Sequence, residues 1–327
     1  MTHDIDKENM RQVLLDFPNQ VKIGWVLGAD ITYTDIENVI VSGMGGSALP
    51  GDILKCYLRH ELKIPLIVSK DYFLPKFAGK NSLVFVASYS GNTEETISSL
   101  KEAARKNCKV VCIASGGKIE EHAKVHNLPF IKIPEGLQPR AAIGYMFFAM
   151  LKIIQNCKLI ESKEKDVERA EKALRKDIYD ELAKKLSAKL VDKIPLIYAS
   201  DDLGCVAEKW KISFNENSKI HAFYNIVPEM NHNELVGYTN VKGNFHVIII
   251  KDDEDFRRIH DRFKVMKEVI KEHDVPVTEI EIKGDCYLTK IFSAIYIGDW
   301  TSYHLALLYG TDPTPVDIVE KFKKKIR

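Results

Sequence analysis

The sequence predicts an α/β protein with two doubly wound parallel-sheet domains joined by a helical linker. Short apolar, β-branched segments alternate with segments of helical periodicity in both halves of the chain, which is typical of βαβ units around a parallel sheet. The length of 327 residues exceeds one ordinary core and fits two domains of about 150 residues each. Between the halves, residues 161–189 are heavily charged with sparse apolar positions at helical spacing, as expected for a solvated pair of connecting helices.

The first half is expected to contain five short strands, each followed by a turn or a helix. The strands are predicted at residues 38–41, 65–68, 82–87, 110–114 and 130–133. Helices are expected after the first strand to about residue 58, at 94–106 and at 140–155. This order predicts a domain over residues 1–157, with ligand contacts at the carboxyl edge of its sheet.

The second half follows a similar plan after a linker expected over residues 158–192. Its strands are predicted at residues 194–198, 245–250 and 275–282. Its helices are predicted at residues 204–217, 256–272 and 287–308, with a last one from near residue 315. These elements predict a second domain over residues 193–327.

The composition indicates a soluble, cytoplasmic protein without a nucleic-acid or membrane partner. The apolar share is 45% and the charged share is 28%, as in globular proteins. Lys and Arg number 47 against 46 Asp and Glu, which leaves no field to attract nucleic acid, and the basic run at residues 321–327 suits a helix C-terminus. No N-terminal apolar segment has the length of a signal or a membrane span. The six cysteines are scattered without a CxxC pair, which favours free thiols.

No metal and no organic cofactor are expected. His122 and His126 stand at i, i+4 spacing, but Glu120 and Glu121 do not share their helical face at metalloprotease spacing. The acidic run at residues 252–255 follows a strand and is interpreted as the start of a helix, where acids suit the dipole. A magnesium site is the alternative interpretation of this run.

The third predicted strand ends in a hydroxyl-rich turn. Ser88, Ser90 and Thr93 precede the helix expected at residues 94–106. Three hydroxyls beside the free N–H groups of a helix N-terminus form a socket for a small anion, and a phosphate monoester fits it best. The alternative is that Thr93 only caps the helix.

A glycine-rich turn follows the first predicted strand. The sequence Gly-x-Gly-x-x-Ala at residues 43–48 matches a dinucleotide fingerprint, and Asp71 lies beyond the second strand. In a dinucleotide site this glycine-rich turn alone contacts the pyrophosphate. Here a second, hydroxyl-rich turn is expected beside the glycine-rich turn at the sheet edge. We therefore interpret Gly46 and Ser47 as part of a grip for one compact phosphate, with a ligand-free turn as the alternative.

Three further residues have features of catalytic groups. Arg140 begins the helix predicted at residues 140–155, where a cation is misplaced unless it faces an anion. Glu216 lies near the end of the helix predicted at residues 204–217, where the dipole raises its proton affinity; a solvated glutamate on a frayed helix end is the alternative. His232 lies among two Asn and two Glu in a non-repetitive loop, which suits proton transfer.

Five motifs resemble those of the archaeal bifunctional phosphoglucose/phosphomannose isomerases, in the sugar isomerase (SIS) superfamily. They are Gly-Met-Gly-Gly-Ser-Ala, Ser-Tyr-Ser-Gly-Asn-Thr-Glu-Glu-Thr, Gln-Pro-Arg-Ala-Ala, Phe-Asn-Glu-Asn and Pro-Glu-Met-Asn-His-Asn-Glu, in that order along almost the whole chain. The resemblance implies two flavodoxin-like SIS domains with five-stranded sheets and a homodimer with shared active sites. It also implies interconversion of glucose 6-phosphate or mannose 6-phosphate with fructose 6-phosphate, without a metal or an organic cofactor.

The resemblance also implies a role for each candidate residue. The residues that would bind the 6-phosphate are Ser47, Ser88, Ser90 and Thr93, beside Gly46. Arg140 would face the enediolate, Glu216 would be the base, and His232, from the other subunit, would help open the ring. A lysine of the C-terminal helix would assist ring opening. The register after residues 312–315 favours Lys323 among Lys321, Lys323, Lys324 and Lys325.

Other protein classes would need other features. A non-catalytic sugar-phosphate-binding SIS regulator would keep the phosphate turns without Glu216, His232 and Arg140 together, and would bring an output domain that the sequence does not show. An amidotransferase-type isomerase would need an N-terminal cysteine nucleophile domain, whereas this sequence begins Met-Thr-His. A nicotinamide-dependent dehydrogenase is the third alternative, because of the fingerprint-like turn.

Overall fold

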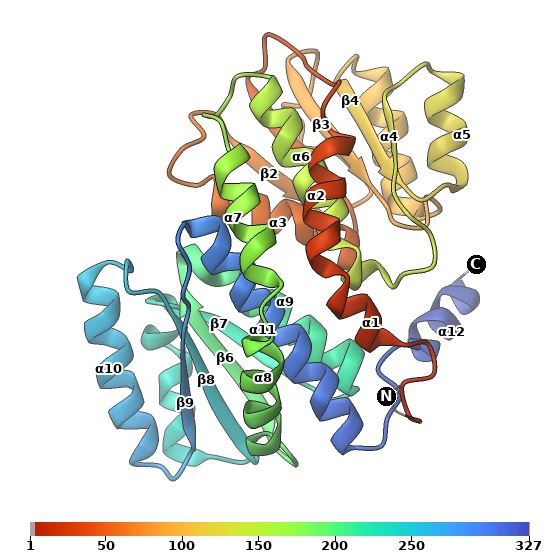
Figure 1. Ribbon diagram of the computed structural model, residues 1–327. Coiled ribbons are helices and arrows are strands. Elements are labelled where there is room, and N and C mark those ends of the chain that lie inside the picture. Colours follow the sequence, from red (N-terminus) through yellow and green to blue (C-terminus); the bar gives the residue numbers. More distant parts are fainter. Residues whose placement is uncertain (1–3, 327) are drawn as a thin grey trace. The chain divides into compact units, whose positions relative to one another are not determined.

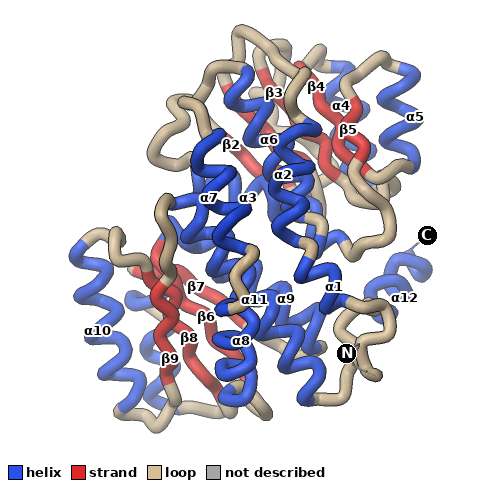
Figure 2. The backbone as a smooth tube through the Cα atoms, viewed as in Figure 1, coloured by secondary structure: helices blue, strands red, loops and turns tan. Residues whose placement is uncertain are grey.

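The computed structural model describes residues 4–326, and its contacts divide the chain into two compact units. The N-terminal unit comprises Asp16–Lys172, and the C-terminal unit comprises Ala173–Arg327 together with Met1–Leu15. Each unit contains one parallel sheet with helices packed around it (Figure 1, Figure 2). The α/β fold class with two parallel sheets is therefore confirmed.

The sheet of the N-terminal unit has five parallel strands in the order β2-β1-β3-β4-β5. The strands are β1 Asn38–Ser42, β2 Leu66–Ser69, β3 Ser82–Ala87, β4 Lys109–Ala114 and β5 Phe130–Lys132. The central strand β3 is buried at every residue. Both faces of a parallel sheet are covered, so apolar and small residues occupy every position of such a strand. The strand order reverses between β1 and β3, so the turns after these strands flank the point at which doubly wound sheets bind ligands.

Six helices belong wholly or mainly to this unit among the described residues. They are α2 Phe17–Leu27, α3 Leu49–Tyr57, α4 Glu94–Arg105, α5 Gly117–Val125, α6 Ile143–Asn156 and α7 Glu164–Leu174. Helices α4 and α5 bury Leu100 and Ile119 against the strands, whereas α6 packs with α2 and α3. The helix predicted from residue 140 begins at Ile143, because Pro139–Ala141 form a separate 3₁₀ turn, η2. A second 3₁₀ turn, η1 Gly45–Ser47, precedes α3.

The sheet of the C-terminal unit has four parallel strands in the order β7-β6-β8-β9 among the described residues. The strands are β6 Ile194–Ser200, β7 Phe223–Val227, β8 Phe245–Lys251 and β9 Val277–Glu281. The five-stranded sheet implied by the resemblance is therefore wrong for this unit. Strand β7 is not among the predicted strands, because it is an edge strand that is mostly half-exposed and contains Asn225, so that it lacks a continuous apolar run.

Six helices belong to the C-terminal unit among the described residues. They are α1 Met10–Leu15, α8 Ile178–Lys189, α9 Gly204–Ser213, α10 Arg257–Lys271, α11 Tyr287–Leu308 and α12 Asp317–Ile326. Shorter turns are η3 Asp201–Leu203, the π-helical turn η4 Phe214–Ser218, η5 Glu229–His232 and η6 Glu234–Asn240. Helix α11 is buried along most of its length and contacts α1, α8 and α9. No described helix, α11 included, is both long and apolar enough to cross a membrane.

Residues 6–14 pack on α11. Asp6 accepts a hydrogen bond from Met10 N at 2.7 Å and another from the Tyr303 hydroxyl at 3.2 Å. The Tyr296 hydroxyl donates to the Leu14 carbonyl at 2.8 Å. Sequence analysis grouped this segment with the first domain, and these bonds to a helix almost 300 residues later (|i−j| of 297 and 282) group it with the C-terminal unit.

Candidate active site

The glycine-rich turn after β1 packs directly on the turn that carries Arg140. Gly45 has φ of +51°, in the left-handed region that glycine reaches without strain. A Cβ placed on Gly46 would lie 2.6 Å from Arg140 N and 2.8 Å from the carbonyl carbon of Pro139, so only glycine permits this approach. Ser47 is buried at the end of the same turn. The structure thus brings Gly46 and Ser47 to the backbone of Arg140.

Ser88 and Thr93 face each other across the turn after β3. Ser88 Oγ, which is buried, donates to Thr93 Oγ1 at 3.0 Å. Thr93 occupies the N-cap position of α4, but its side chain makes no capping hydrogen bond, so capping alone does not account for this hydroxyl. Ser90 is exposed, and its Oγ accepts a hydrogen bond from Asn92 N at 3.3 Å. The three hydroxyls therefore belong to one turn, two of them in contact.

Tyr89 links four turns at the carboxyl edge of the sheet. Its N–H donates to Ser47 Oγ at 2.9 Å, and its carbonyl accepts from Ser115 Oγ at 2.7 Å. Its hydroxyl donates to the Pro134 carbonyl at 2.9 Å and accepts from Leu137 N at 2.7 Å. Burial raises the pKa of the Tyr89 phenol, so the group stays a donor at neutral pH. Sequence analysis missed this residue, although an aromatic between two serines at a strand end is a usable signal.

Gly91 lets the turns after β3 and β4 touch. Its φ is +66°, and a Cβ there would lie 1.8 Å from the Gly116 carbonyl oxygen. The Gly91 carbonyl also accepts a hydrogen bond from Ile119 N at 3.0 Å, in the first turn of α5. Any side chain at Gly91 would therefore push the hydroxyl-rich turn away from its neighbour.

Arg140 is buried at the same edge, with 2% of its surface exposed. It lies in η2, one turn before α6, and not at the first residue of a long helix as the sequence suggested. Gln20 holds this turn in place, since Gln20 Nε2 donates to the Ala141 carbonyl at 2.7 Å and Gln20 Oε1 accepts from Gly144 N at 3.1 Å. A guanidinium stays charged even when buried, so η2 carries a positive charge in the turn that packs on Gly46.

Glu216 lies in the π-helical turn that follows α9. Such turns recur at functional sites. The residues after Glu216 are anchored on α11, because Asn217 Nδ2 donates to Ser302 Oγ at 2.9 Å and Ser218 Oγ donates to the Ser302 carbonyl at 2.7 Å. Glu216 itself is half-buried. An anchored turn of this kind differs from the frayed helix end that was the alternative interpretation.

His232 lies on η5, and its side chain is exposed. The loop around it is anchored by a partly buried cluster in which Tyr198 Oη donates to Glu234 Oε1 at 2.6 Å and Asn225 Nδ2 donates to Glu234 Oε2 at 2.5 Å. Burial raises the pKa of Tyr198 far above its usual range, so this hydroxyl remains a donor.

Lys323 lies on α12, which has no buried residue among those described. Its ammonium is 2.7 Å from Glu320 Oε1, and both side chains are more than half exposed. The structure therefore places Lys323 on a solvent-facing helix, in contact with a glutamate of its own helix.

The acidic run after β8 encloses a lysine. Lys290 Nζ lies 2.6 Å from Asp252 Oδ1, 2.8 Å from Asp253 Oδ1 and 3.3 Å from Glu254 Oε2. Helix α10 begins only at Arg257, so the interpretation of this run as the start of a helix is wrong. The ammonium takes the position among the carboxylates that a magnesium ion would need. Across the described residues, no group of three or more His, Cys, Asp or Glu side chains is arranged to hold a metal.

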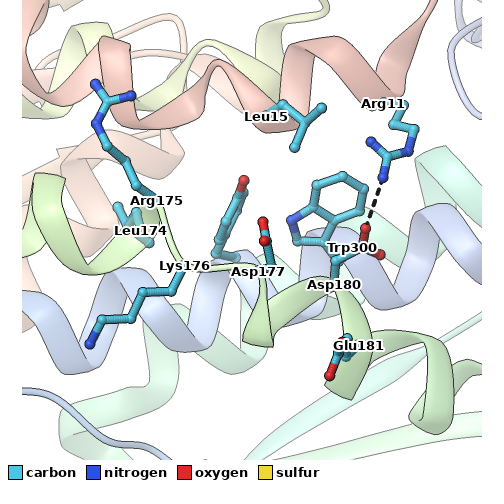
Figure 3. Close-up of a pocket in the computed structure, with 10 residues that line it drawn as sticks. Arg11, Leu15, Leu174, Arg175, Lys176, Asp177, Asp180, Glu181 and Trp300 are labelled. Atoms are coloured by element: carbon cyan, nitrogen blue, oxygen red, sulfur yellow. Dashed lines mark hydrogen bonds and ion pairs between the residues drawn. The ribbon is translucent and has the colours of Figure 1, made fainter.

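A cavity of about 350 Å³ in the C-terminal unit contains none of the predicted site residues (Figure 3). Its lining comes from α1, the segment before α8, α8 itself and α11. Arg11 Nη2 is 3.1 Å from Asp180 Oδ2, and Asp180 also contacts His304. The charged residues of the lining balance in number, with three basic and three acidic side chains, so the cavity has no net charge that would attract a sugar phosphate.

Comparison with known proteins identifies the class of both halves. The model of the SIS domain matches residues 32–134, and the model of the bacterial phospho-glucose isomerase C-terminal SIS domain matches residues 179–326. The C-terminal domain of glucosamine-fructose-6-phosphate aminotransferase from Francisella tularensis has a similar fold, with a TM-score of 0.72 at 16% identity over 94% of this chain and 98% of that one. The chain is therefore a protein of two SIS domains.

Two relatives match over nearly the full length. The chain is 38% identical to the bifunctional phosphoglucose/phosphomannose isomerase of Caldicellulosiruptor bescii, over 97% of this chain and 98% of that protein. It is 33% identical to the protein of the same name from Aquifex aeolicus, over 98% of this chain and 99% of that protein. The chain belongs to the family of bifunctional phosphoglucose/phosphomannose isomerases, which confirms the resemblance seen in its motifs.

Proposed function

We propose that this protein is an aldose–ketose isomerase that interconverts glucose 6-phosphate and mannose 6-phosphate with fructose 6-phosphate. Membership of the isomerase family supports the reaction class. The observation that carries the proposal is the cluster of Ser47, Ser88 and Thr93 hydroxyls at the carboxyl edge of the first sheet, beside the buried Arg140. Such a cluster suits one phosphate, whereas a dinucleotide site would have to accommodate two.

The phosphate turns provide donors without a lysine. Ser47 Oγ accepts from Tyr89 N, so its own proton remains to be donated to an anion. Ser88 and Thr93 add two hydroxyls, and the N-terminus of α4 adds free N–H groups and a partial positive charge. In the proposal Gly46 and Ser90 complete this grip through close backbone approach and a surface hydroxyl.

The proposed chemistry moves a proton between two neighbouring carbons. His232 and Lys323 open the sugar ring by proton transfer at the hemiacetal. Glu216 then takes the proton from C2 of the aldose and returns it to C1, while the hydroxyl proton passes from O2 to O1 through a cis-enediol. Arg140 stabilises the negative charge on the enediolate oxygens by about 3 kcal/mol, the magnitude found for comparable oxyanion donors.

In this proposal the protein needs neither a metal nor an organic cofactor and works as a homodimer with shared active sites. A carboxylate and a guanidinium together supply the base and the charge stabilisation that the reaction requires. His232 acts from the second subunit, which is consistent with its exposed side chain in the single chain.

A coupled assay tests the function. The protein is supplied with fructose 6-phosphate in EDTA, and glucose 6-phosphate and mannose 6-phosphate are detected separately. We expect both products, formed at least about 100-fold more slowly by the Glu216→Gln variant. Binding of fructose 6-phosphate without either product would instead favour the non-catalytic SIS regulator, and loss of turnover in EDTA would overturn the metal-independent mechanism.

A further inference from the structure

Lys209 and Asp299 form a buried ion pair behind the π-helical turn that carries Glu216. Lys209 is 1% exposed and Asp299 is 5% exposed. The Lys209 ammonium contacts Asp299 Oδ1 and donates to Ser213 Oγ at 2.8 Å. Ser213 Oγ in turn donates to Asp299 Oδ1 at 2.6 Å. Three buried polar side chains on α9 and α11 therefore satisfy one another.

The same network reaches both ends of the π-helical turn. At the start of the turn, Ser213 is the residue directly before Phe214. At its other end, Asn217 Nδ2 donates to Ser302 Oγ at 2.9 Å, and Ser302 Oγ donates to the Asp299 carbonyl at 2.9 Å. The ion pair is thus connected to Asn217, the residue after Glu216, through the carbonyl of Asp299 and the hydroxyl of Ser302.

A buried ion pair contributes little net stability to the folded state. The cost of removing two charges from water is commonly as large as their attraction, and a well-packed apolar pair would serve the core equally well. An ion pair with directional hydrogen bonds does, however, fix the surrounding side chains and backbone in one arrangement. A general base needs such a fixed arrangement, because a displacement of about 1 Å can lower the rate about 100-fold.

We propose that Lys209, Asp299 and Ser302 are positioning residues that hold Glu216 in reach of the reacting carbons. The inference rests on the proposed role of Glu216 as the base. Loosening the network lowers kcat, since proton transfer depends on the position of the carboxylate. KM changes little, since the phosphate is bound by turns of the N-terminal unit.

The test replaces the ion pair by apolar residues of similar size, Lys209→Met with Asp299→Leu, so that no single charge is left buried. The matched control is Lys290→Met with Asp252→Leu, which removes another buried pair of the same unit. We expect kcat of the first variant to fall by about 30-fold or more, with KM within about threefold, and kcat of the control to stay within about threefold. The isotope effect with glucose 6-phosphate deuterated at C2 should rise only in the first variant, because proton transfer becomes slower than the other steps.

A single substitution covers the case in which the double variant does not fold. Ser302→Ala removes the link to Asn217, and Ser302→Thr keeps the hydroxyl, so the inference predicts loss of kcat in the first and recovery in the second. An unchanged kcat and isotope effect in the folded double variant and in Ser302→Ala would overturn it. The failure of the proposed function itself is recognised separately, because the unchanged protein would then form neither glucose 6-phosphate nor mannose 6-phosphate, whereas full activity in Glu216→Gln would remove only the proposed base.

Discussion

At the scale of single residues, the proposed reaction depends on the half-buried carboxylate of Glu216 in the turn after α9. The change Glu216→Gln keeps the shape of the side chain and removes the base. We expect turnover to fall by about 10²- to 10⁴-fold, the usual contribution of a positioned base, while the affinity for fructose 6-phosphate changes little. Steady-state assays and titration calorimetry measure the two effects. Turnover within about tenfold of the unchanged protein would exclude Glu216 as the base.

The paired hydroxyls of Ser88 and Thr93 are expected to contribute to the affinity for the phosphate group. The double change Ser88→Ala with Thr93→Ala removes a contact of 3.0 Å and two hydroxyls from the proposed phosphate grip. The affinity for a hexose 6-phosphate should fall by about 10- to 100-fold, equivalent to about 1.4 to 2.7 kcal/mol. Ser99→Ala, in the same helix but outside the turn, is the control and should leave affinity unchanged. Equal affinity in both variants would mean that the phosphate binds elsewhere.

At the scale of elements, the turns after β1, β3, β4 and β5 act as one body, because Tyr89 lies in the turn after β3 and bonds to the other three. Tyr89→Phe removes the hydroxyl that contacts the Pro134 carbonyl and Leu137 N at 2.9 and 2.7 Å. We expect a loss of stability of about 1 to 3 kcal/mol and a clear drop in kcat, since the segment that leads to Arg140 is released. Tyr33→Phe, which loses one bond to the Val110 carbonyl, is the control. It should lose stability and keep its kcat; an equal loss of kcat in both would refute a special role for Tyr89.

The loop that carries His232 depends on a similar anchor. Tyr198→Phe removes the donor to Glu234 Oε1 and should lower the free energy of unfolding by about 1 to 3 kcal/mol. Because the loop is loosened, turnover from the closed-ring sugar should also fall. Tyr179→Phe, which loses a buried contact to Ser293 in the same unit, should lower stability alone. Chemical denaturation and initial rates together distinguish a loop effect from a general loss of stability.

At the scale of the whole molecule, the buried His246 and the half-buried His304 make stability depend on pH. Desolvation is the largest cause that lowers the pKa of His246 and of His304 in the folded protein. The unfolded chain therefore takes up these protons first as the pH falls, and the free energy of unfolding decreases below about pH 6.5. Each histidine contributes at most about 1.4 kcal/mol per pH unit.

Urea denaturation at several pH values between 5 and 8 measures this slope. His246→Gln should flatten it, since a neutral amide replaces the titrating ring that contacts Thr278 Oγ1 at 2.8 Å. A slope that is identical in the variant and the unchanged protein would mean that His246 is not responsible.

Much of the fold follows from local pattern. The strands of the first sheet are apolar and bounded by turn residues, so each was predicted close to its observed position. Strand β7 was not, because an edge strand with Asn225 needs no continuous apolar run. The start of α6 was placed three residues early, because Pro139 and its neighbours fit a helix locally but form a 3₁₀ turn that packs on Gly46.

The sequence by itself determined the class of this protein and the identity of its candidate groups. A strand that ends in Ser, Gly and Thr residues before a helix predicts an anion site by local chemistry alone. The contacts that hold these groups are visible only in the tertiary structure. Tyr89 joins four turns of the first sheet, and the ion pair of Lys209 and Asp299 supports the turn that carries Glu216. The reason is physical, since hydrogen bonds between residues far apart in sequence depend on strand order and helix packing, which no local pattern encodes.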